Sequence, residues 1–468
     1  MRRTAVALTL LTALSCGSFV GSQAVSAASA PAGAGGGGGG RGTNILVVGI
    51  DSRAGLSAAE KRRLHVGGKG CNCTDVMMLV HLSQNRRRAS IVSIPRDSYV
   101  EYAGATAPAR SGKINGAYAI GGGPLTVATV EKATGLHIDH YLETGFTGFE
   151  QTVNNLGGAT LCTDRPLKDE NSGLDIGAGR HLADGNGTLR YARARHVNLR
   201  PGDLGRVRRQ QRVVNDLLAR LTAEGSLNGP ISTARTVRTL LKTVRTDART
   251  GLDDLVRIGW ALGRLRADRT EFATVPIRLF DHRVPGVGST LVWDEARSAA
   301  LWDALGADRP ITGDTRIQPV AEHPAPTDPA RITVRVDDAD VAAALRGNGF
   351  AVTDTSPTAP AVRPSGPPVV RYATGQEENA ATVAAALPGS RLQVDPDLDA
   401  VVEVAVGTRP VQVDTVTYDR NVADGAPVTA DRLRCAEAAA AAGPAGAARP
   451  AGGTAGGTAG GTGPTGRR

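Results

Sequence analysis

The sequence predicts an α/β fold in which a central mixed sheet is covered by helices and is followed by a small α/β C-terminal domain. Strand and helix signals alternate through most of the chain. A second, shorter alternation follows a Pro-rich stretch. Because amphipathic helices bury their apolar stripes against a sheet, this alternation is typical of layered α/β domains.

The expected strands are short β-branched runs bounded by turn residues. The strongest are NILVVGI (44–50), VMMLVHL (76–82) and ASIVSI (89–94), and the weaker ones are HIDHYLET (137–144) and ATLCT (159–163). Helices are expected where apolar residues recur at helical spacing, at 124–134, 148–156, 203–221 and 252–265. Further on, ARITVRVDDADVAAALRGNGFAV predicts strand, helix and strand, and VVRYATGQEENAATVAAAL repeats the order.

Changes in composition predict the domain boundaries. The end of the chain is rich in Ala, Gly, Thr and Pro, and such a segment cannot bury enough apolar surface to fold. The expected segments are a signal peptide or anchor (1–30), a Gly-rich linker (31–43), a large domain (44–312), a Pro-rich linker (313–330), a small α/β domain (331–412) and a poorly structured tail (413–468).

The N-terminus has the pattern of an export signal. Two arginines precede an uncharged stretch over residues 4–30, which ends in Ala-Ser-Ala. This stretch is either a cleaved signal peptide or an uncleaved membrane anchor, because it is long enough to span a bilayer. Both alternatives predict an extracytoplasmic position for residue 44 onward.

The formal net charge of +9 predicts an anionic partner: nucleic acid, a membrane surface, phosphate or a wall polymer. Single-stranded nucleic acid is commonly bound by stacking on aromatic rings, and aromatic residues form only 3% of this chain. Export also separates the protein from chromosomal DNA. We therefore expect no nucleic-acid partner.

Four cysteines remain if Cys16 leaves with a signal peptide: Cys71, Cys73, Cys162 and Cys435. An exported protein meets oxidising conditions, which permit disulfides. Since two cysteines in Cys-x-Cys lie close together in sequence, we expect Cys71 or Cys73 to pair with Cys162. The rival is a Cys-x-Cys metal site, which no second cysteine pair or His-x-x-x-His supports.

Charged residues stand at the ends of the first three expected strands. Asp51 follows the first strand, Asp75 precedes the second, and Arg96 follows the third. If consecutive strands are antiparallel, the three side chains converge at one edge of the sheet. Two carboxylates there can hold a hard cation such as Mg2+ together with substrate phosphate oxygens, or they can form an ordinary salt bridge with Arg96.

A helix that begins near Asp203 places Asp203, Arg206 and Gln210 on one face. The same spacing leaves three further arginines largely outside this face, where we expect them to be solvated: Arg208, Arg209 and Arg212.

Just upstream of that helix, LRYARARH carries Arg193 and Arg195 two residues apart. A cluster of arginines suits a diphosphate, since each guanidinium donates two hydrogen bonds to phosphate oxygens and stays charged. Positioning and neutralisation of charge are also what phosphoryl transfer requires.

The motifs NILVVGIDSR, TDVMMLVHL, SIPRDSYV, KINGAYAIGGG, NNLGGATL, LRYARARH and GDLGRVRRQQ resemble, in this order, the LytR-CpsA-Psr family of bacterial cell-wall enzymes. The resemblance covers residues 44–312, and 331–412 resemble the small C-terminal domain often attached to them. It implies a phosphotransferase that moves a glycopolymer from a polyprenyl-pyrophosphate carrier to a muramic acid hydroxyl of peptidoglycan, with Mg2+. It also implies work at the outer face of the cytoplasmic membrane or in the cell wall.

The resemblance implies roles for particular residues. Asp51 and Asp75 would bind Mg2+, and Asp203 would orient the arginines or assist removal of the acceptor proton. The catalytic group would consist of Asp203, Arg206 and Arg96. The diphosphate would be bound by Arg53, Arg96, Lys113, Arg193, Arg195, Arg206 and Gln210.

The sequence departs from the family pattern in two places. Cys73 stands where the family commonly has an arginine, and the spacer before Asp203 is longer than expected. Two other functions stay open at this point: hydrolysis of the same lipid carrier by a pyrophosphatase, and non-catalytic binding to the wall or regulation.

Overall fold

The computed structural model describes residues 42–67, 70–104, 111–163, 166–195, 197, 204–223, 230–319, 321–353, 366–407 and 410–435. The expected signal segment, most of the Gly-rich linker and Asp203 lie outside these residues. Among the described residues, no helix has the length and apolar character needed to cross a bilayer.

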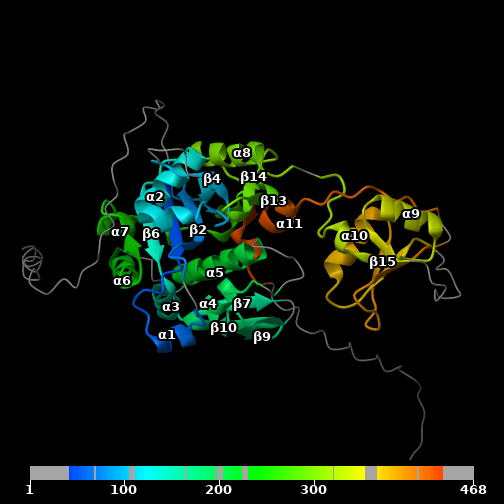
Figure 1. The fold of residues 1–468 in the computed structure, drawn as a ribbon, viewed down its shortest axis with the longest axis horizontal. Coiled ribbons are helices and arrows are strands. Elements are labelled where there is room, and N and C mark those ends of the chain that lie inside the picture. Colours follow the sequence, from blue (N-terminus) through cyan, green and yellow to red (C-terminus); the bar gives the residue numbers. More distant parts are fainter. Residues whose placement is uncertain are drawn as a thin grey trace, which may run out of the picture. The chain divides into compact units, whose positions relative to one another are not determined.

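A seven-stranded sheet forms the centre of the large domain, in the order β11–β6–β1–β2–β3–β12–β20 (Figure 1). β1 (Thr43–Ile50), β2 (Thr74–Leu82) and β3 (Ala89–Ser93) are successively antiparallel. β6 (His140–Thr144) is parallel to β1, and β12 (Thr270–Thr274) is parallel to β3. The sheet is therefore mixed, as the sequence predicts.

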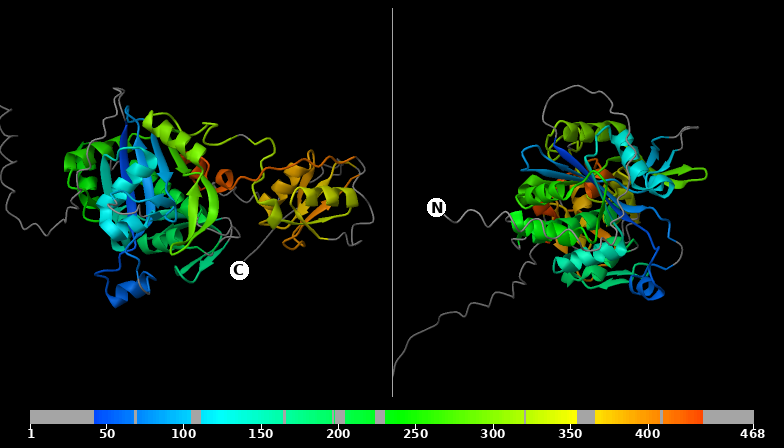
Figure 2. Two further views of the ribbon diagram at one scale, coloured as in Figure 1. Left: turned by 45° about the horizontal axis from the view of Figure 1, so that its top comes forward. Right: turned by 90° about the vertical axis from the view of Figure 1, so that its left-hand side faces the viewer.

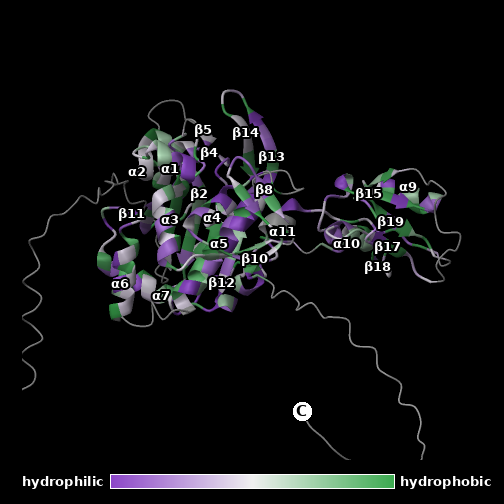
Figure 3. Cartoon of the chain, turned by 90° about the horizontal axis from the view of Figure 1, so that it is seen from below, coloured by the Kyte–Doolittle hydropathy of each residue, from purple (hydrophilic) through white to green (hydrophobic). Residues whose placement is uncertain are grey.

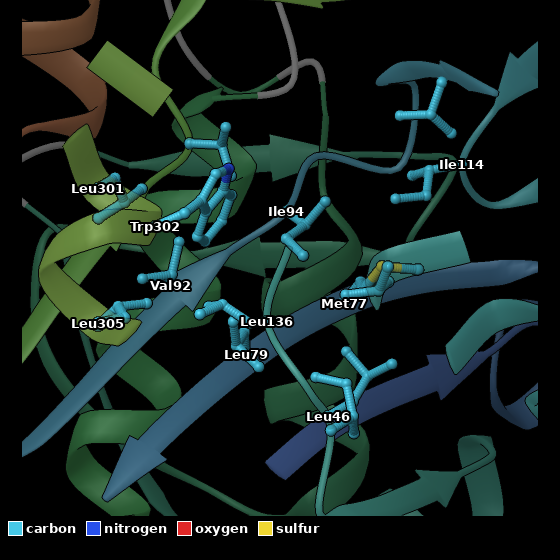
Figure 4. Close-up of a cluster of buried hydrophobic side chains, with 14 of the residues drawn as sticks. Leu46, Met77, Leu79, Val92, Ile94, Ile114, Leu136, Leu301, Trp302 and Leu305 are labelled. Carbon is cyan, nitrogen blue, oxygen red and sulfur yellow. The ribbon is translucent and has the colours of Figure 1, made fainter. Parts of the chain in front are cut away.

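Helices cover both faces of this sheet (Figure 2). Since side chains alternate along a strand, Leu46 and Val48 of β1 face one layer, which contains α2 (Gly116–Thr134) and α8 (Glu295–Gly306). Ile45 and Val47 face the other layer, in which α6 (Pro230–Leu240) and α7 (Leu252–Leu262) pack against β1, while α5 (Leu204–Ala223) packs against β2, β3 and β12. Figure 4 shows the first of these cores, in which Trp302 and Leu305 of α8 meet Leu79 and Val92.

A smaller layer packs beside α5. Its buried apolar residues come from β7 (Ala159–Thr163), α3 (Phe146–Asn155) and α4 (Gly185–Arg193), as well as from α5. The expected strand at 159–163 therefore exists but pairs with β10 (Gly179–Ala183) outside the central sheet. The remaining elements of the large domain are α1 (Ala58–Arg63), β4 (Tyr99–Glu101), β5 (Ser111–Lys113), β8 (Leu167–Asp169), β9 (Leu174–Ile176), β11 (Arg245–Thr246), η1 (Ala267–Arg269), β13 (Ile277–Val284) and β14 (Gly288–Trp293).

The small domain has its own five-stranded sheet, in the order β16–β15–β19–β17–β18, and its own apolar core. Two helices, α9 and α10, follow strands β15 and β17, so that the strand–helix order occurs twice, as expected. The elements are η2 (Pro329–Arg331), β15 (Thr333–Val336), α9 (Ala339–Gly347), β16 (Ala351–Thr353), β17 (Val369–Tyr372), α10 (Glu377–Ala386), β18 (Arg391–Val394) and β19 (Val402–Ala405).

The chain then returns to the large domain, so the prediction of a poorly structured tail from residue 413 is wrong for residues 419–434, the return segment. It contains α11 (Arg420–Gly425), β20 (Val428–Thr429) and α12 (Ala430–Leu433). β20 adds an antiparallel edge strand beside β12. Asn421 exchanges two hydrogen bonds with the backbone of Ile277, of 2.7 and 2.9 Å.

Cys71 and Cys73 are bonded to each other. The expected bond from one of them to Cys162 is therefore wrong. The reason lies in Asn72, whose φ of 48° is in the left-handed region that Asn tolerates well. This turn brings the Cα atoms of the two cysteines to 5.1 Å, a separation that disulfides commonly span.

The return segment should contribute to the stability of the large domain. Leu433 is buried with Phe272, Ile91 and Met78, so Leu433→Ala should lower the free energy of unfolding by about 2–5 kcal/mol. All three tryptophans lie in the large domain, so tryptophan fluorescence during urea denaturation reports its unfolding.

The matched control is Leu392→Ala in the small domain, where the side chain is exposed. It should change the same transition by no more than about 0.5 kcal/mol. Equal effects of the two substitutions would contradict the packing role of the return segment.

Candidate active site

A cavity of about 420 Å³ opens where β1 ends. Its charged lining comes from the strand ends, α4 and α5. Its apolar lining extends back along β1 and β2, to Val47 and Met78, and includes Phe146 and Phe149 of α3 and Val213 and Val214 of α5. The cavity therefore joins a charged end to an apolar wall.

The antiparallel strands bring Asp51, Asp75 and Arg96 into this cavity together. Asp51 is buried, and Arg53 donates to both of its carboxylate oxygens, at 2.9 and 3.1 Å. Asp75 is paired with Arg96. The two aspartates expected to bind a cation are thus each bonded to an arginine expected to bind the diphosphate.

Arg193 belongs to α4 and reaches the same cavity. It donates to the backbone oxygens of Leu64 and His65, at 2.9 and 3.2 Å. Burial lowers the pKa of Arg193, while Asp75 and Asp51 act in the opposite direction. Because the ordinary pKa of arginine lies far above neutrality, the side chain stays charged at pH 7.

Arg206 and Gln210, one turn apart on α5, both line the cavity, and Arg206 is only 4% exposed. Gln210 donates to the backbone oxygen of Ala192 at 3.2 Å, so its amide is bonded to α4. A guanidinium this deeply placed can meet an anionic ligand in surroundings of low dielectric constant, where the interaction is strong.

Three further expected residues have different outcomes. Arg195 lines the cavity, although its side chain is exposed. Lys113 does not line the cavity, and its Nζ lies 2.8 Å from Asp97 instead. Asp203 falls outside the described residues, so the structure does not place it.

The turn between β8 and β9 supplies residues that the sequence analysis missed. Asp169, Asn171 and Ser172 all line the cavity. One carboxylate oxygen of Asp169 accepts from the backbone N–H of Arg195 at 2.9 Å and from the hydroxyl of Ser172 at 3.1 Å. The run DENSG is a turn signal, but nothing in it indicates which distant strands the turn approaches.

The expectation that Arg209 is solvated is wrong. Its side chain is 5% exposed and donates to the backbone oxygens of Tyr191 and Ala194, which flank Arg193. Arg208 is partly buried and donates to Gln211 at 3.1 Å, whereas Arg212 is exposed, as expected. Arg209 therefore holds the end of α4 that carries two of the cavity arginines.

The charges of the cavity favour an anion. Five arginines line it against three aspartates, Asp51, Asp75 and Asp169, which gives a formal net charge of +2. Cavity arginines and a continuous apolar wall suit a ligand with a phosphate head and a hydrocarbon tail.

A sequence profile of the LytR_cpsA_psr family matches residues 35–306, more than half of the chain. The chain belongs to the LytR-CpsA-Psr family. A second profile, described as LytR cell envelope-related transcriptional attenuator, matches residues 338–409. The family resemblance expected from the motifs is confirmed, and neither profile reaches the return segment at 419–434.

Named relatives of this family are similar over part of their length. A probable cell wall biosynthesis protein, LcpB of Corynebacterium glutamicum, is 38% identical over 265 residues, 56% of this chain and 61% of that protein. The polyisoprenyl-teichoic acid–peptidoglycan teichoic acid transferase TagU of Bacillus cereus is 33% identical over 206 residues, 44% of this chain and 60% of TagU. The chain thus spans about 60% of the length of these relatives.

Among solved structures of the family, the crystal structure of TagV from Bacillus subtilis is similar to this chain. The two share 24% sequence identity with a TM-score of 0.47, over 58% of this chain and 98% of TagV.

Arg209 should be needed for the geometry of the α4 end. Arg209→Ala removes the donors of two buried carbonyls, which should lower the free energy of unfolding by about 1–3 kcal/mol. Arg212→Ala, on the same helix, should change it by less than about 0.5 kcal/mol. Thermal unfolding of the two variants measures the difference, and similar melting temperatures would show that Arg209 has no such role.

Proposed function

We propose that this protein is a phosphotransferase that moves a glycopolymer from a polyprenyl-pyrophosphate carrier to a hydroxyl of peptidoglycan. The observation that carries the proposal is that five arginines adjoin an apolar wall within one cavity. A polyprenyl pyrophosphate has the matching parts, a diphosphate and a hydrocarbon chain. The family of the chain and the names of LcpB and TagU support the same function.

The arginines would act on the transferred phosphate. Arg96, Arg193 and Arg206 come from three separate elements, and none needs to leave the cavity to contact a diphosphate there. Charge that develops on the phosphate oxygens during transfer is stabilised best by donors already in place. A fixed cluster of guanidinium groups meets this requirement.

In the proposed reaction the oxygen of the acceptor hydroxyl attacks the sugar-proximal phosphorus. A new P–O bond forms, the bond from that phosphorus to the bridging oxygen breaks, and polyprenyl phosphate leaves with the bridging oxygen. The proton of the hydroxyl passes to a base. Asp203 is our candidate for that base, and Asp169 stays committed to the backbone of Arg195.

Magnesium fits the carboxylates that the cavity offers. The described residues contain no cluster of three or more His, Cys, Asp or Glu residues that could hold a metal ion. Mg2+ is commonly held by one or two carboxylates with substrate phosphate oxygens and water, so Asp51 and Asp75 suffice. The ion would neutralise charge on the diphosphate.

We expect activity to stop with EDTA and to return with Mg2+. Asp75→Asn should raise the Mg2+ concentration needed for half-maximal activity.

The proposed reaction places the protein outside the cytoplasm, at the outer face of the cytoplasmic membrane or in the cell wall. The N-terminal pattern of residues 1–30 supports this location. Carrier and acceptor would meet there, because the carrier is a membrane lipid and the acceptor is part of the wall.

Transfer and hydrolysis can be separated in one assay. Purified protein is incubated with a lipid-linked glycopolymer, with and without peptidoglycan oligomers. A transferase forms the glycopolymer–peptidoglycan product only with the oligomers and releases little glycan phosphate without them. Release that is independent of the acceptor would instead identify a pyrophosphatase.

Arg206→Ala should reduce product formation by about 100-fold or more, because it removes a buried donor to the transferred phosphate. Arg212→Ala, exposed on the same helix, is the control and should keep nearly full activity. Equal activities would favour the alternative of a non-catalytic wall-binding protein.

A further inference from the structure

The outer surface of α6 and α7 has a pattern that the proposed reaction does not use. The two helices lie side by side at one edge of the large domain (Figure 1). Exposed side chains recur on each at helical spacing. We call them the α6–α7 face: Ile231, Arg235 and Arg238 on α6, and Arg257, Trp260 and Arg264, of which the first two are on α7 and Arg264 follows it.

Two large apolar side chains on this face are exposed although the helices already have a buried stripe. Val237, Leu255 and Ile258 form that stripe against the sheet. Ile231 is nevertheless 78% exposed and Trp260 43% exposed. Both hydrophobic and hydrophilic residues are visible on these helices in Figure 3. The two residues therefore present apolar surface that the core does not cover, and this surface suits contact with another apolar medium.

The charge around these residues has one predominant sign. Residues 230–269 contain nine lysines and arginines and four aspartates, a formal net charge of +5 out of +9 for the whole chain. The guanidinium of Arg264 lies 3.8 Å from the centre of the Trp260 ring. Tryptophan beside arginine is the combination found where a protein meets the headgroup region of a membrane.

The position of the α6–α7 face relative to the cavity also suits contact with a membrane. Val47 lines the cavity and also packs against the apolar cluster beneath α6 and α7. Ile45, two residues further from Asp51 on the same strand face, is a member of that cluster. The apolar wall of the cavity thus continues, away from its charged end, into the core under the α6–α7 face.

We propose that the α6–α7 face docks on the surface of an anionic phospholipid bilayer, with Trp260 and Ile231 at the headgroup boundary and the arginines among the lipid phosphates. The proposal deepens the proposed function and rests on it, since a cavity for a membrane lipid gains from a fixed orientation on the membrane. The chain also enters β1 at Thr43, the end of that strand remote from Asp51, after the expected export segment.

The first test compares two triple variants of the full chain for binding to vesicles. One carries Arg235→Gln, Arg238→Gln and Arg264→Gln on the face. The control carries Arg283→Gln, Arg331→Gln and Arg391→Gln, which are exposed elsewhere and remove the same charge. The anionic vesicles contain phosphatidylcholine with roughly 30 mol% phosphatidylglycerol, whose negative surface attracts basic residues. Vesicles of phosphatidylcholine alone serve as the neutral reference.

Each arginine near an anionic surface should strengthen binding by roughly fivefold, so the face variant should bind the anionic vesicles on the order of 100-fold more weakly than the wild type. The control variant should stay close to the wild type. Equal weakening in both variants would overturn the proposal, because it would show that only net charge matters.

The second test reads Trp260 directly. Vesicles of brominated phosphatidylcholine with phosphatidylglycerol quench a tryptophan that reaches the headgroup boundary. The only other tryptophans, Trp293 and Trp302, lie in or next to the core around α8. Quenching in the wild type should therefore disappear in Trp260→Phe, whatever the expected N-terminal segment contributes to binding. Quenching that is absent in the wild type, or that persists in Trp260→Phe, would overturn the proposal.

The readouts of these two tests do not depend on whether the proposed function is correct. Vesicle binding and quenching need no turnover, and transferase activity can be measured with a short-chain substrate in detergent. A protein that transfers the glycopolymer but shows no quenching refutes only the docking face. A protein that docks but does not transfer the glycopolymer refutes only the proposed function.

Discussion

The antiparallel pairing of β1, β2 and β3 is the constraint on which the charged end of the cavity depends. It places the end of β1, the start of β2 and the end of β3 at one edge of the sheet, and with them Asp51, Asp75 and Arg96. A slip of one residue in this register would turn every side chain of a strand to the opposite face. The apolar alternation that fixes the core therefore also fixes the site.

Helix α5 ties the rest of the cavity to that edge through neighbouring residues with different contacts. Gln211 is fully buried and donates to Ser93, Ala273 and Thr274 of the sheet. Arg209 donates to the end of α4, while Arg206 and Gln210 face the cavity. Because each residue turns about 100° from the last along a helix, one short run can hold two neighbouring elements and still line a site.

Local sequence patterns predicted much of this arrangement. Most of what they did not predict depends on contacts between residues that are far apart in the sequence. The strand runs and the ends that carry Asp51, Asp75 and Arg96 are visible in the sequence because the period of a strand is local. The bonds of Arg209 to α4 are not visible, since a helix pattern separates buried from exposed faces but does not identify what lies opposite. β20 has only two residues, too few for any periodicity, and its place depends on pairing with β12 far earlier in the chain. The Cys71–Cys73 bond depends on the backbone conformation of a single residue between them.

Ion pairs inside the cavity lower the cost of gathering two of its arginines there. An unpaired guanidinium with little access to water costs several kcal/mol. Arg53 and Arg96 avoid this cost by bonding to Asp51 and Asp75, the carboxylates proposed for Mg2+. In the proposed function, a diphosphate would offer these arginines new acceptors and would leave the aspartates available to a cation. Binding would then exchange one set of buried charge pairs for another, so the cavity would need no large change in buried net charge to accept or release the proposed ligand.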